Sequence, residues 1–585
     1  MNPFGRVTLA VLTAVMAAAL GAPAGAVADD GPTLHVDQAD ANCSSGGPGS
    51  ADQPFCTIGA AAAVAGPGTT VVVESGTYQE TVRPAASGTA DSPVTFTAAP
   101  GERVVVASRN AGDFAFYLWR LAHVRVRGFT VDGGNGIYVG ESDHVDVVGN
   151  RLSAGEHGVY LQSTTDSRVE DNTVRRAREG IYLNASDRNR VAGNAISSGG
   201  FGVFLRYGAD ANAVEANVVH DNARGVYAVW SADNVIANNL IYANGDWGIR
   251  LAAADSDGTA PRPLGTGTRI LSNTLSGNAT ASSVAAQEIN VDGSTRTTIG
   301  NNVINVEAAR AAIRIAPDSV PGTSLDGNVL DAPDGTRLVQ WEDRSYYTLS
   351  SFNAATGQES QGAQGDPRFA APADGDFSLR AGSPAVDSAL SAGPGDPANP
   401  FALPANDAFG GGRVDDLTTP NSGGGTRPYG DRGAYEMRNP GFEGGLAGWN
   451  ASGSGTGATI TPVAAGHAGN GAVKLANSGT GPTTCALNDS PNVVRVTHAG
   501  TYSARAWVRA DTPGAALKFR LREWNGTVAV GEGKTITPLT TDWQLVTVRY
   551  TAGAPGTSTL DLNAYVVGAA PGTCFYADDV SVALG

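Results

Sequence analysis

A repeated phrase of glycine, apolar and aromatic residues runs through the middle of the chain. Each copy has a glycine, an aliphatic residue, usually an aromatic residue, and then another apolar residue. This alternation predicts a short strand with one buried face. The copies begin 22 or 23 residues apart, at Gly136, Gly158, Gly180, Gly202, Gly225 and Gly248. Eight residues before most of these glycines lies an asparagine, which follows a second short strand, at Asn150, Asn172, Asn194 and Asn217.

A unit of this size, with short strands and polar turns but no helix, cannot bury its apolar face alone. Stacked copies bury a continuous core, so the pattern predicts a solenoid of parallel, in-register coils. We expect glycine and asparagine to turn the coil, with asparagine also satisfying backbone groups of the next coil. Aliphatic residues should fill the coil, and the aromatic residues should stand outside it. A leucine-rich repeat is excluded, because its leucine signature is missing.

The chain resembles the right-handed parallel β-helix proteins, which include polysaccharide lyases, glycoside hydrolases and mannuronan epimerases. Beyond the repeat, residues 54–61 and 66–82 are similar to the opening of that fold, with a capping helix and first strands. Segments beginning at Asp366, Gly382 and Asp431 are similar to its closing segment. The resemblance covers most of residues 30–437 and implies an all-β fold, whereas it is weak evidence for function because the fold hosts unrelated chemistries.

A second domain is expected after Glu436. Lysine first appears at Lys474, and the coil repeat disappears. Alternating segments beginning at Gly500, Asp542 and Phe575 predict an antiparallel β-sandwich. They resemble jelly-roll carbohydrate-binding modules. Arg520, Arg522, Trp524 and Asn525 form an alternating polar and aromatic run suited to contacting sugar, with Trp524 either a stacking platform for sugar or part of the core. The resemblance also implies a structural calcium site of Glu443 with Asp578 or Asp579, while Trp449, Trp507 and Trp543 are expected to pack the core.

The first residues predict a targeting segment. Arg6, the apolar run 7–20 and an Ala-x-Ala site ending at Ala28 are typical of a secretory signal peptide. We therefore expect a signal peptide at 1–28, a β-helix domain at 29–437 and a carbohydrate-binding-like sandwich at 438–585. The mature protein should be secreted and extracellular, monomeric and not bound to a membrane.

Cysteine use and charge narrow the class further. Cys43 with Cys56, and Cys485 with Cys574, should form two disulfides, each inside one domain. A net charge of −17 argues against a nucleic-acid partner. The sequence contains no cluster of cysteine and histidine residues of the kind that would indicate a zinc site. We expect no organic cofactor, and calcium is the one metal that the resemblance implies.

Residues at equal offsets from the repeated glycine should be neighbours on the outside of the solenoid. The middle coils then present a mixed cluster of histidine, glutamate, arginine and aromatic side chains. The predicted catalytic residues are His157, Tyr182, Arg206 and Arg224, and the predicted substrate contacts on this domain are Glu179, Tyr207, Tyr227, Trp230, Trp247 and Arg250. The basic charge suits a polyanionic glycan. The interruption at 252–268 should form one wall of a functional groove.

The favoured function is a polysaccharide lyase that cleaves a uronate-containing glycan by β-elimination. Such an enzyme needs a carboxylate neutraliser, a base and an acid. No lysine lies between the predicted cleavage site and Lys474, so His157 or Tyr182 is expected to be the base. The Asp-Pro-His-Asp motif of the epimerases is absent. Two alternatives stay open: a glycoside hydrolase that pairs Glu179 with Asp221 or Asp246, and a secreted protein that only binds glycan.

Overall fold

The structure is a computed structural model that describes most of the chain after residue 30. The described residues are 31–108, 110, 112–253, 265–279, 286–307, 311–380, 382–391, 401, 403–408, 413, 419–425, 428–437, 441–442, 445–446, 448–467, 470–489, 492–494, 497–498, 500–526, 528–555 and 558–584. The predicted signal peptide, Glu443 and most of the interruption at 252–268 therefore lie outside the described residues. None of the described helices has the length and apolar character that crossing a membrane requires.

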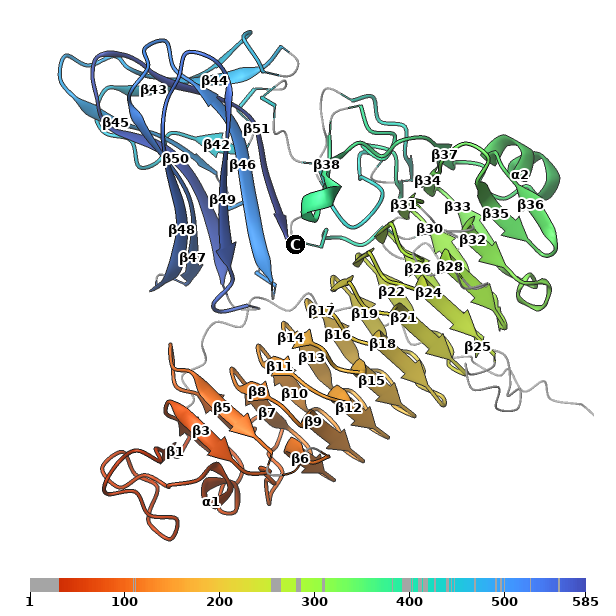
Figure 1. Ribbon diagram of the computed structural model, residues 1–585, viewed down its shortest axis with the longest axis vertical. Helices are drawn as coiled ribbons and strands as arrows, with labels where there is room; N and C mark the ends of the chain where they lie inside the picture. Colours follow the sequence, from red (N-terminus) through yellow and green to blue (C-terminus); the bar gives the residue numbers. More distant parts are fainter. Residues whose placement is uncertain are drawn as a thin grey trace, which may run out of the picture.

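The first domain is a right-handed parallel β-helix, as predicted, with three long sheets along its axis (Figure 1). Sheet I has twelve strands: β1 (Thr33–Val36), β2 (Thr70–Val73), β4 (Val94–Ala98), β7 (Val124–Arg127), β10 (Asp146–Val148), β13 (Arg168–Glu170), β16 (Arg190–Ala192), β19 (Ala213–Glu215), β22 (Val235–Ala237), β26 (Arg269–Leu271), β30 (Thr298–Gly300) and β33 (Ser324–Asp326).

Sheet II follows sheet I in each coil, and the repeated phrase forms sheet III. Sheet II contains β3 (Gly76–Gln79), β5 (Val104–Ala107), β8 (Thr130–Asp132), β11 (Arg151–Ser153), β14 (Thr173–Arg175), β17 (Ala195–Ser197), β20 (Val218–His220), β23 (Leu240–Tyr242), β27 (Thr274–Ser276), β31 (Val303–Asn305), β34 (Val329–Asp331) and β37 (Ala363–Gln364). Sheet III contains β6 (Phe114–Trp119), β9 (Asn135–Gly140), β12 (His157–Gln162), β15 (Glu179–Asn184), β18 (Phe201–Arg206), β21 (Arg224–Val229), β24 (Trp247–Ala252), β28 (Gln287–Asp292), β32 (Ala311–Ile315), β35 (Arg337–Trp341) and β36 (Arg344–Tyr346).

The repeated asparagines form a ladder of stacked side chains inside the turn between sheets I and II. The side-chain oxygen of Asn172 accepts hydrogen bonds from the backbone N–H and the side-chain amide of Asn150, at 2.9 and 3.0 Å. The Asn150 amide also donates to the Val126 carbonyl one coil back, at 3.0 Å. Each buried amide thus ties three coils together and satisfies polar groups that burial would otherwise leave unpaired. The same bonds continue through Asn194, Asn217, Asn239, Asn273, Asn302 and Asn328.

The repeated glycine does not turn the coil, which corrects the prediction. Gly158 and Gly180 lie within strands and are buried. A Cβ on Gly158 would lie 2.4 Å from the Gly180 carbonyl oxygen, and one on Gly180 would lie 2.6 Å from that of Gly202. The glycine is needed because adjacent coils approach too closely for a side chain. Left-handed turn positions are instead often filled by other residues, such as Asp166 and Arg188.

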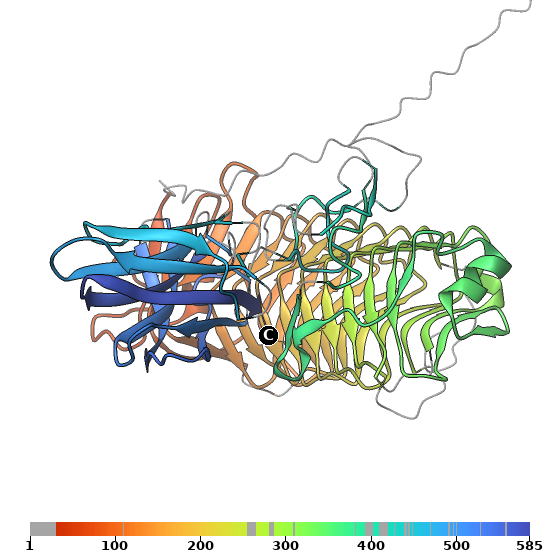
Figure 2. The same cartoon turned by 90° about the horizontal axis from the view of Figure 1, so that it is seen from above.

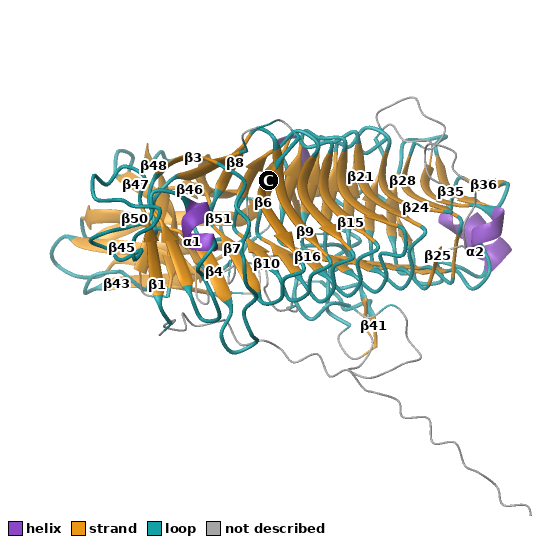
Figure 3. Cartoon of the chain, turned by 90° about the horizontal axis from the view of Figure 1, so that it is seen from below, coloured by secondary structure: helices purple, strands orange, loops and turns teal. Residues whose placement is uncertain are grey.

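Short helices lie near the two ends of the solenoid (Figure 3). α1 (Ile58–Ala62) packs against β1 and β2, as the predicted capping helix should. α2 (Leu349–Thr356) packs against β35 and β36, with Leu349 and Phe352 buried. The 3-10 helices η1 (Pro317–Ser319) and η2 (Pro372–Asp374) are single turns. The small strand pairs are β25 (Gly265–Thr266) with β29 (Ser294–Thr295), β38 (Phe369–Ala371) with β39 (Asp376–Leu379), and β40 (Leu390–Ser391) with β41 (Gly424–Gly425).

The closing segment runs back along the outside of sheet II. Asn301 donates to the Leu390 carbonyl at 2.8 Å, and Asn238, two coils nearer the N-terminus, donates to the Asn406 carbonyl at 2.8 Å. Outward apolar side chains of sheet II, such as Leu240 and Val329, are buried in the same cluster as Phe377. This return covers one face of the solenoid and leaves the outer face of sheet III to other uses.

The second domain is an antiparallel β-sandwich, as predicted. One five-stranded sheet contains β42 (Trp449–Asn450), β45 (Thr483–Asp489), β50 (Thr559–Ala569), β47 (Ala516–Asn525) and β48 (Val528–Pro538). The other contains β43 (Ala458–Val463), β44 (Ala472–Asn477), β51 (Gly572–Leu584), β46 (Thr501–Arg509) and β49 (Gln544–Thr551). Both predicted disulfides are confirmed: Cys43 with Cys56 in the first domain, and Cys485 with Cys574 in the second.

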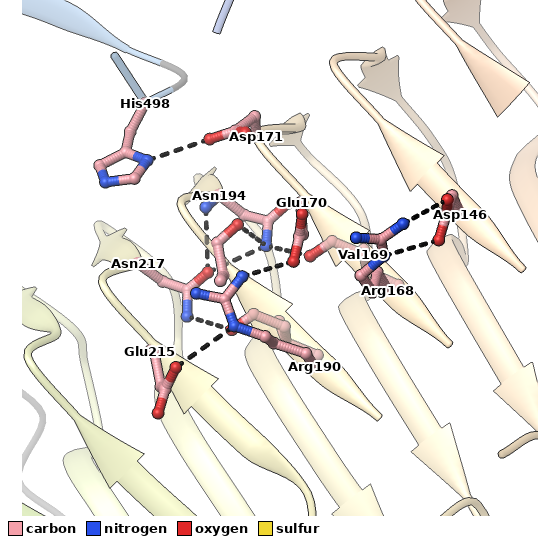
Figure 4. Close-up of polar contacts among 12 residues, drawn as sticks. Asp146, Arg168, Val169, Glu170, Asp171, Arg190, Asn194, Glu215, Asn217 and His498 are labelled. Carbon is pink, nitrogen blue, oxygen red and sulfur yellow. Dashed lines mark hydrogen bonds and ion pairs between the residues drawn. The ribbon is translucent and has the colours of Figure 1, made fainter. Parts of the chain in front are cut away.

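The sandwich lies beside the first half of the solenoid (Figures 1 and 2). Its contacts reach the turn between sheets I and II. His498 places Nδ1 3.0 Å from Asp171 Oδ1 (Figure 4). The Arg151 guanidinium donates to the Ala552 carbonyl at 3.3 Å. The carboxylate of Asp171 is therefore part of the contact between the two domains.

Candidate active site on sheet III

The outer face of sheet III carries the predicted columns of side chains, and the strand register confirms them. His157 pairs with Glu179, Tyr160 with Tyr182, and Asn184 with Arg206. We call this surface the aromatic face: the outward side chains of β6, β9, β12, β15, β18, β21 and β24. Parallel strands lie about 4.8 Å apart, so side chains at equal positions are close enough to contact one another.

Stacked rings form the centre of the aromatic face. The centroids of Tyr160 and Tyr182 are 4.8 Å apart, and those of Tyr182 and Phe204 are 4.9 Å apart, with nearly parallel planes. The sequence interpretation missed an earlier coil, β6, where Tyr117 stacks on Tyr138 at 4.7 Å. The alternation of residues from Phe114 to Trp119 indicated this strand, but the strand lacks the repeated glycine by which the other coils were aligned.

His157 and Glu179 lie side by side on neighbouring strands. Nδ1 of His157 lies 3.1 Å from Oε2 of Glu179, with 18% and 10% of the two side chains exposed. The two atoms are close but are not aligned for a hydrogen bond. The imidazole also stacks on Tyr160, with the ring centroids 4.8 Å apart. Because Nδ1 faces the carboxylate, Nε2 is the nitrogen that can exchange a proton with a substrate.

Tyr182 and Arg206 form the adjoining pair. Their side chains are hydrogen bonded, and the Tyr182 ring centroid lies 6.0 Å from that of His157. Burial raises the pKa of the Tyr182 hydroxyl to about 12, with the Tyr160 phenol adding to the rise and Arg206 opposing it. Tyr182 therefore keeps its proton at neutral pH. The raised pKa makes the hydroxyl a weaker acid than that of an ordinary tyrosine, and the role of Tyr182 in proton transfer stays a prediction.

The arginines predicted to gather positive charge have different partners. Nε of Arg224 lies 3.0 Å from Asp246, and Arg250 lies 3.7 Å from Asp292, so these two charges are partly neutralised. The Arg206 guanidinium lies over the Tyr207 ring, 4.2 Å from its centroid. Arg206 is on the strand next to Tyr182, and Tyr182 is in turn close to His157.

Several predicted substrate contacts prove to be supports for their neighbours. The Tyr227 side chain is fully buried, and Trp247 is only 2% exposed. The Arg250 guanidinium lies over both rings, 5.7 and 4.9 Å from their centroids. Trp230 is 7% exposed and donates its indole N–H to the Ala253 carbonyl. In this structure Tyr227 cannot touch a glycan, because rings and guanidinium groups of adjacent coils cover it.

In the sandwich, one face of β47 carries the predicted sugar-binding side chains. Alternate residues of β47 are buried, which places Arg520, Arg522 and Trp524 together on the outer side. The Arg522 guanidinium lies 2.6 Å from Glu532 and 5.4 Å from the Trp524 ring centroid. The Arg522 hydrogen bond lowers the pKa of Glu532 to about 2, so this pair stays charged. Trp524 is therefore an outer-face residue and not core.

Other sandwich predictions have different outcomes. Trp507 and Trp543 do not pack the core: both are half-buried, near His467 on the outside of the second sheet, with the Trp507 and His467 centroids 3.7 Å apart. Asp578 accepts a hydrogen bond from the His467 backbone N–H at 2.6 Å, and Asp579 lies 3.0 Å from His467 Nδ1. Glu443 is outside the described residues, so the calcium site stays a prediction.

Comparison with known proteins separates the same two parts of the chain. Residues 97–309 match the family model described as periplasmic copper-binding protein (NosD). Residues 436–570 match the model described as carbohydrate binding domain. The chain thus combines a parallel β-helix with a carbohydrate-binding-type sandwich. The uncharacterized protein YwoF of Bacillus subtilis (strain 168) is 27% identical over 418 residues, which cover 58% of this chain and 89% of YwoF.

Two solved lyases are also similar. Pectate lyase Pel9A is 16% identical with a TM-score of 0.36, covering 70% of this chain and 98% of that one. An alginate lyase from Paenibacillus sp. str. FPU-7 is 19% identical with a TM-score of 0.34, covering 49% of this chain and 94% of that one.

Proposed function

We propose that the protein is a secreted enzyme that cleaves an acidic polysaccharide by β-elimination on the aromatic face, while the sandwich holds the glycan. The observation that carries this proposal is the contact between two pairs on adjacent strands: His157 with Glu179, and Tyr182 with Arg206. Together they offer a base, an acid and a cation for the substrate carboxylate.

Each group has a defined role in the reaction. Arg206 neutralises the uronate carboxylate, which makes the proton on C5 more acidic. Nε2 of His157 removes that proton, and Glu179 orients the ring and stabilises the resulting imidazolium. The C5–H electrons form the C4–C5 double bond, and the bond from C4 to the glycosidic oxygen breaks. Tyr182 gives its proton to that oxygen, so the products are an unsaturated uronate and a new hydroxyl end.

The geometry supports a hydrolase less well. Asp246 precedes β24, which lies three strands beyond the β15 strand that begins with Glu179. Three strand spacings are about 14 Å, beyond the 5 to 9.5 Å that paired carboxylates need. Asp246 is also held by Arg224 at 3.0 Å. Asp221 lies outside sheet III, beside His220 at 2.8 Å.

Secretion is part of the same proposal. Two disulfides suit an oxidising compartment, and the targeting pattern of the first residues agrees with it. The carbohydrate-binding match over 436–570 supports a polysaccharide as the partner.

One assay distinguishes the three classes of function. Purified protein is incubated with uronate-containing and neutral polysaccharides while ultraviolet absorbance and reducing ends are followed together. We expect new absorbance and new reducing ends on an acidic glycan. Reducing ends without absorbance would indicate hydrolysis, and glycan binding without either product would indicate a binding protein. Either result contradicts the elimination proposal.

A further inference from the structure

Two histidines of different coils come together far from the catalytic pairs. His123 and His144 occupy the same position in the turn from sheet III to sheet I, one coil apart, just before β7 and β10. Their ring centroids are 4.7 Å apart. Asp143 lies beside them, with Oδ1 2.7 Å from Nδ1 of His144. In the sequence they are separated by 21 residues, so no local motif revealed the group.

The three side chains can offer ligand atoms to a single ion. One nitrogen from each histidine and one oxygen of Asp143 all lie within 4.8 Å of one another, and within the described residues this is the one such group of three. Two ligands at about 2.0 Å from an ion stand at most about 4 Å apart. A small rotation closes the difference, because 52% of the His144 side chain and 48% of that of Asp143 are exposed.

The backbone beneath these side chains is held in place. The His123 N–H donates to the Asp143 carbonyl at 3.3 Å, and its own carbonyl accepts from Val94 at 3.0 Å. The His144 N–H donates to the Thr165 carbonyl at 3.2 Å. Both histidines have left-handed φ values, 54° and 50°. Since neighbouring coils fix both turns, ligation needs side-chain rotation only, and the ordering cost is small.

From this arrangement we infer that His123, Asp143 and His144 bind a divalent transition-metal ion, with solvent completing its coordination. Two imidazoles and one carboxylate suit Cu²⁺, Zn²⁺ and Ni²⁺ rather than Ca²⁺ or Mg²⁺. Among these ions, Cu²⁺ should bind most tightly under the general affinity order. The inference is independent of the proposed glycan chemistry.

The same turn in the following coils shows why the site is local. Asp166 and Arg188 occupy the next two positions, and their side chains pair at 2.7 Å. They offer no imidazole. His220 with Asp221 at 2.8 Å resembles half of the site, with one imidazole beside one carboxylate. This second pair provides a matched control.

The test uses the tag-free mature chain and Cu²⁺ as the probe. His123→Asn and His144→Asn remove the imidazoles, and asparagine tolerates the left-handed backbone. Isothermal titration should give one site in the wild type, each substitution should weaken binding at least about tenfold, and the double variant should lose the site. Electron paramagnetic resonance should show nitrogen splitting that the double variant lacks. His220→Asn should leave both readouts unchanged.

Thermal unfolding of each variant without metal checks that the coils remain intact. Added Cu²⁺ should raise the melting temperature of the wild type but not of the double variant, because only the native site binds the ion. The inference is overturned if the folded double variant binds Cu²⁺ as tightly as the wild type, or if His220→Asn weakens binding equally.

Discussion

A side chain on the aromatic face takes its chemical role from the residue one coil away. Tyr182 lies beside Arg206 and keeps its proton, whereas Tyr227 has the same position in its phrase and is fully buried. Arg224 contacts Asp246 and lies over the Phe201 ring, and Arg206 lies over the Tyr207 ring next to Tyr182. Identical residues at equivalent positions of the repeat therefore have different surroundings.

Substitution in the two central pairs tests the proposed chemistry. Arg206→Ala should lower the rate about a hundredfold, because it removes about 3 kcal/mol of transition-state charge stabilisation. His157→Ala should be at least as damaging, and Tyr182→Phe should remove the acid while keeping the ring. Initial rates on the wild-type substrate measure these effects. Arg188→Ala, in a different turn, is the control and should keep the wild-type rate.

Thermal unfolding of each variant checks that the coils remain intact. Tyr182 is buried in the ring cluster, so Tyr182→Phe, which keeps the ring, should unfold close to the wild-type temperature. If all three central variants cleave at the wild-type rate, the reaction takes place elsewhere on the molecule.

Trp524 tests the sugar-binding role of the sandwich. Trp524→Ala removes the aromatic side chain on the outer face of β47, so binding should weaken by about 1–3 kcal/mol, as for other large aromatic contacts. Affinity electrophoresis of the full chain in gels containing the substrate glycan measures the loss. Leu545→Ala, which removes a 48% exposed side chain from the other sheet, is the control. Equal retardation of both variants would place binding on another surface.

At the scale of the element, two asparagine ladders end in buried carboxyl groups. One is the ladder from Asn150 to Asn328, and the other, Asn222, Asn244 and Asn278, lies in the turn between sheets II and III. The Asn278 backbone N–H and amide donate to the two oxygens of Glu288, at 2.9 and 2.6 Å. Asn328 donates to Glu359 in the same way, at 3.1 and 2.6 Å. Burial raises the pKa of Glu288 to about 8 and that of Glu359 to about 7, against an ordinary value of 4.5.

These raised pKa values predict how stability depends on pH. Between the unfolded value near 4.5 and the folded values, the native chain holds protons that the unfolded chain releases. The free energy of unfolding therefore falls as pH rises through this window, by up to about 1.4 kcal/mol per pH unit for each group. Glu288→Gln and Glu359→Gln remove this contribution, and the glutamine oxygen can still accept from the ladder.

Denaturant unfolding at pH 5 and pH 8 provides the measurement. The loss of stability between the two pH values should be smaller in either glutamine variant than in the wild type. Glu342→Gln, at an exposed turn, should behave as the wild type. A wild-type pH dependence in both ladder variants would show that these carboxyl groups ionise normally.

At the scale of the whole molecule, the sandwich is held by polar contacts with the solenoid and by an apolar cluster that it shares with sheet II and the closing segment. His498 of the sandwich contacts Asp171 of the solenoid (Figure 4). Arg151 of the solenoid donates to the Ala552 carbonyl of the sandwich. Single polar contacts of this kind contribute about 0.5–1.5 kcal/mol each. The relative position of the two domains should therefore respond to their removal.

Combining Arg151→Ala with His498→Ala should loosen the sandwich from the coils. Small-angle scattering should show a larger radius of gyration and a broader distance distribution, with both domains still folded by circular dichroism. Arg188→Ala, outside this contact, should leave the scattering curve unchanged. An unchanged curve for the double variant would mean that apolar packing alone sets the position of the sandwich.

Local pattern was enough to predict the solenoid, its register and the sandwich. A period of 22 or 23 residues places equivalent positions of the repeat on adjacent coils. The pairing of Tyr160 with Tyr182 therefore follows from the repeat length. The two disulfides followed from compartment and position. The role of asparagine was also predictable, because a buried amide must satisfy its neighbours.

Tertiary structure decided what spacing could not. The burial of a side chain depends on everything that packs around it. The full burial of Tyr227 could therefore be established only from the folded chain, in which the rings of adjacent coils cover it. Ion pairing depends on distances across coils, and the contact of Arg224 with Asp246 is seen only in the folded chain. The return of the closing segment over sheet II and the meeting of His123 with His144 also come from the folded chain, because turns between strands bring together residues that no local pattern links.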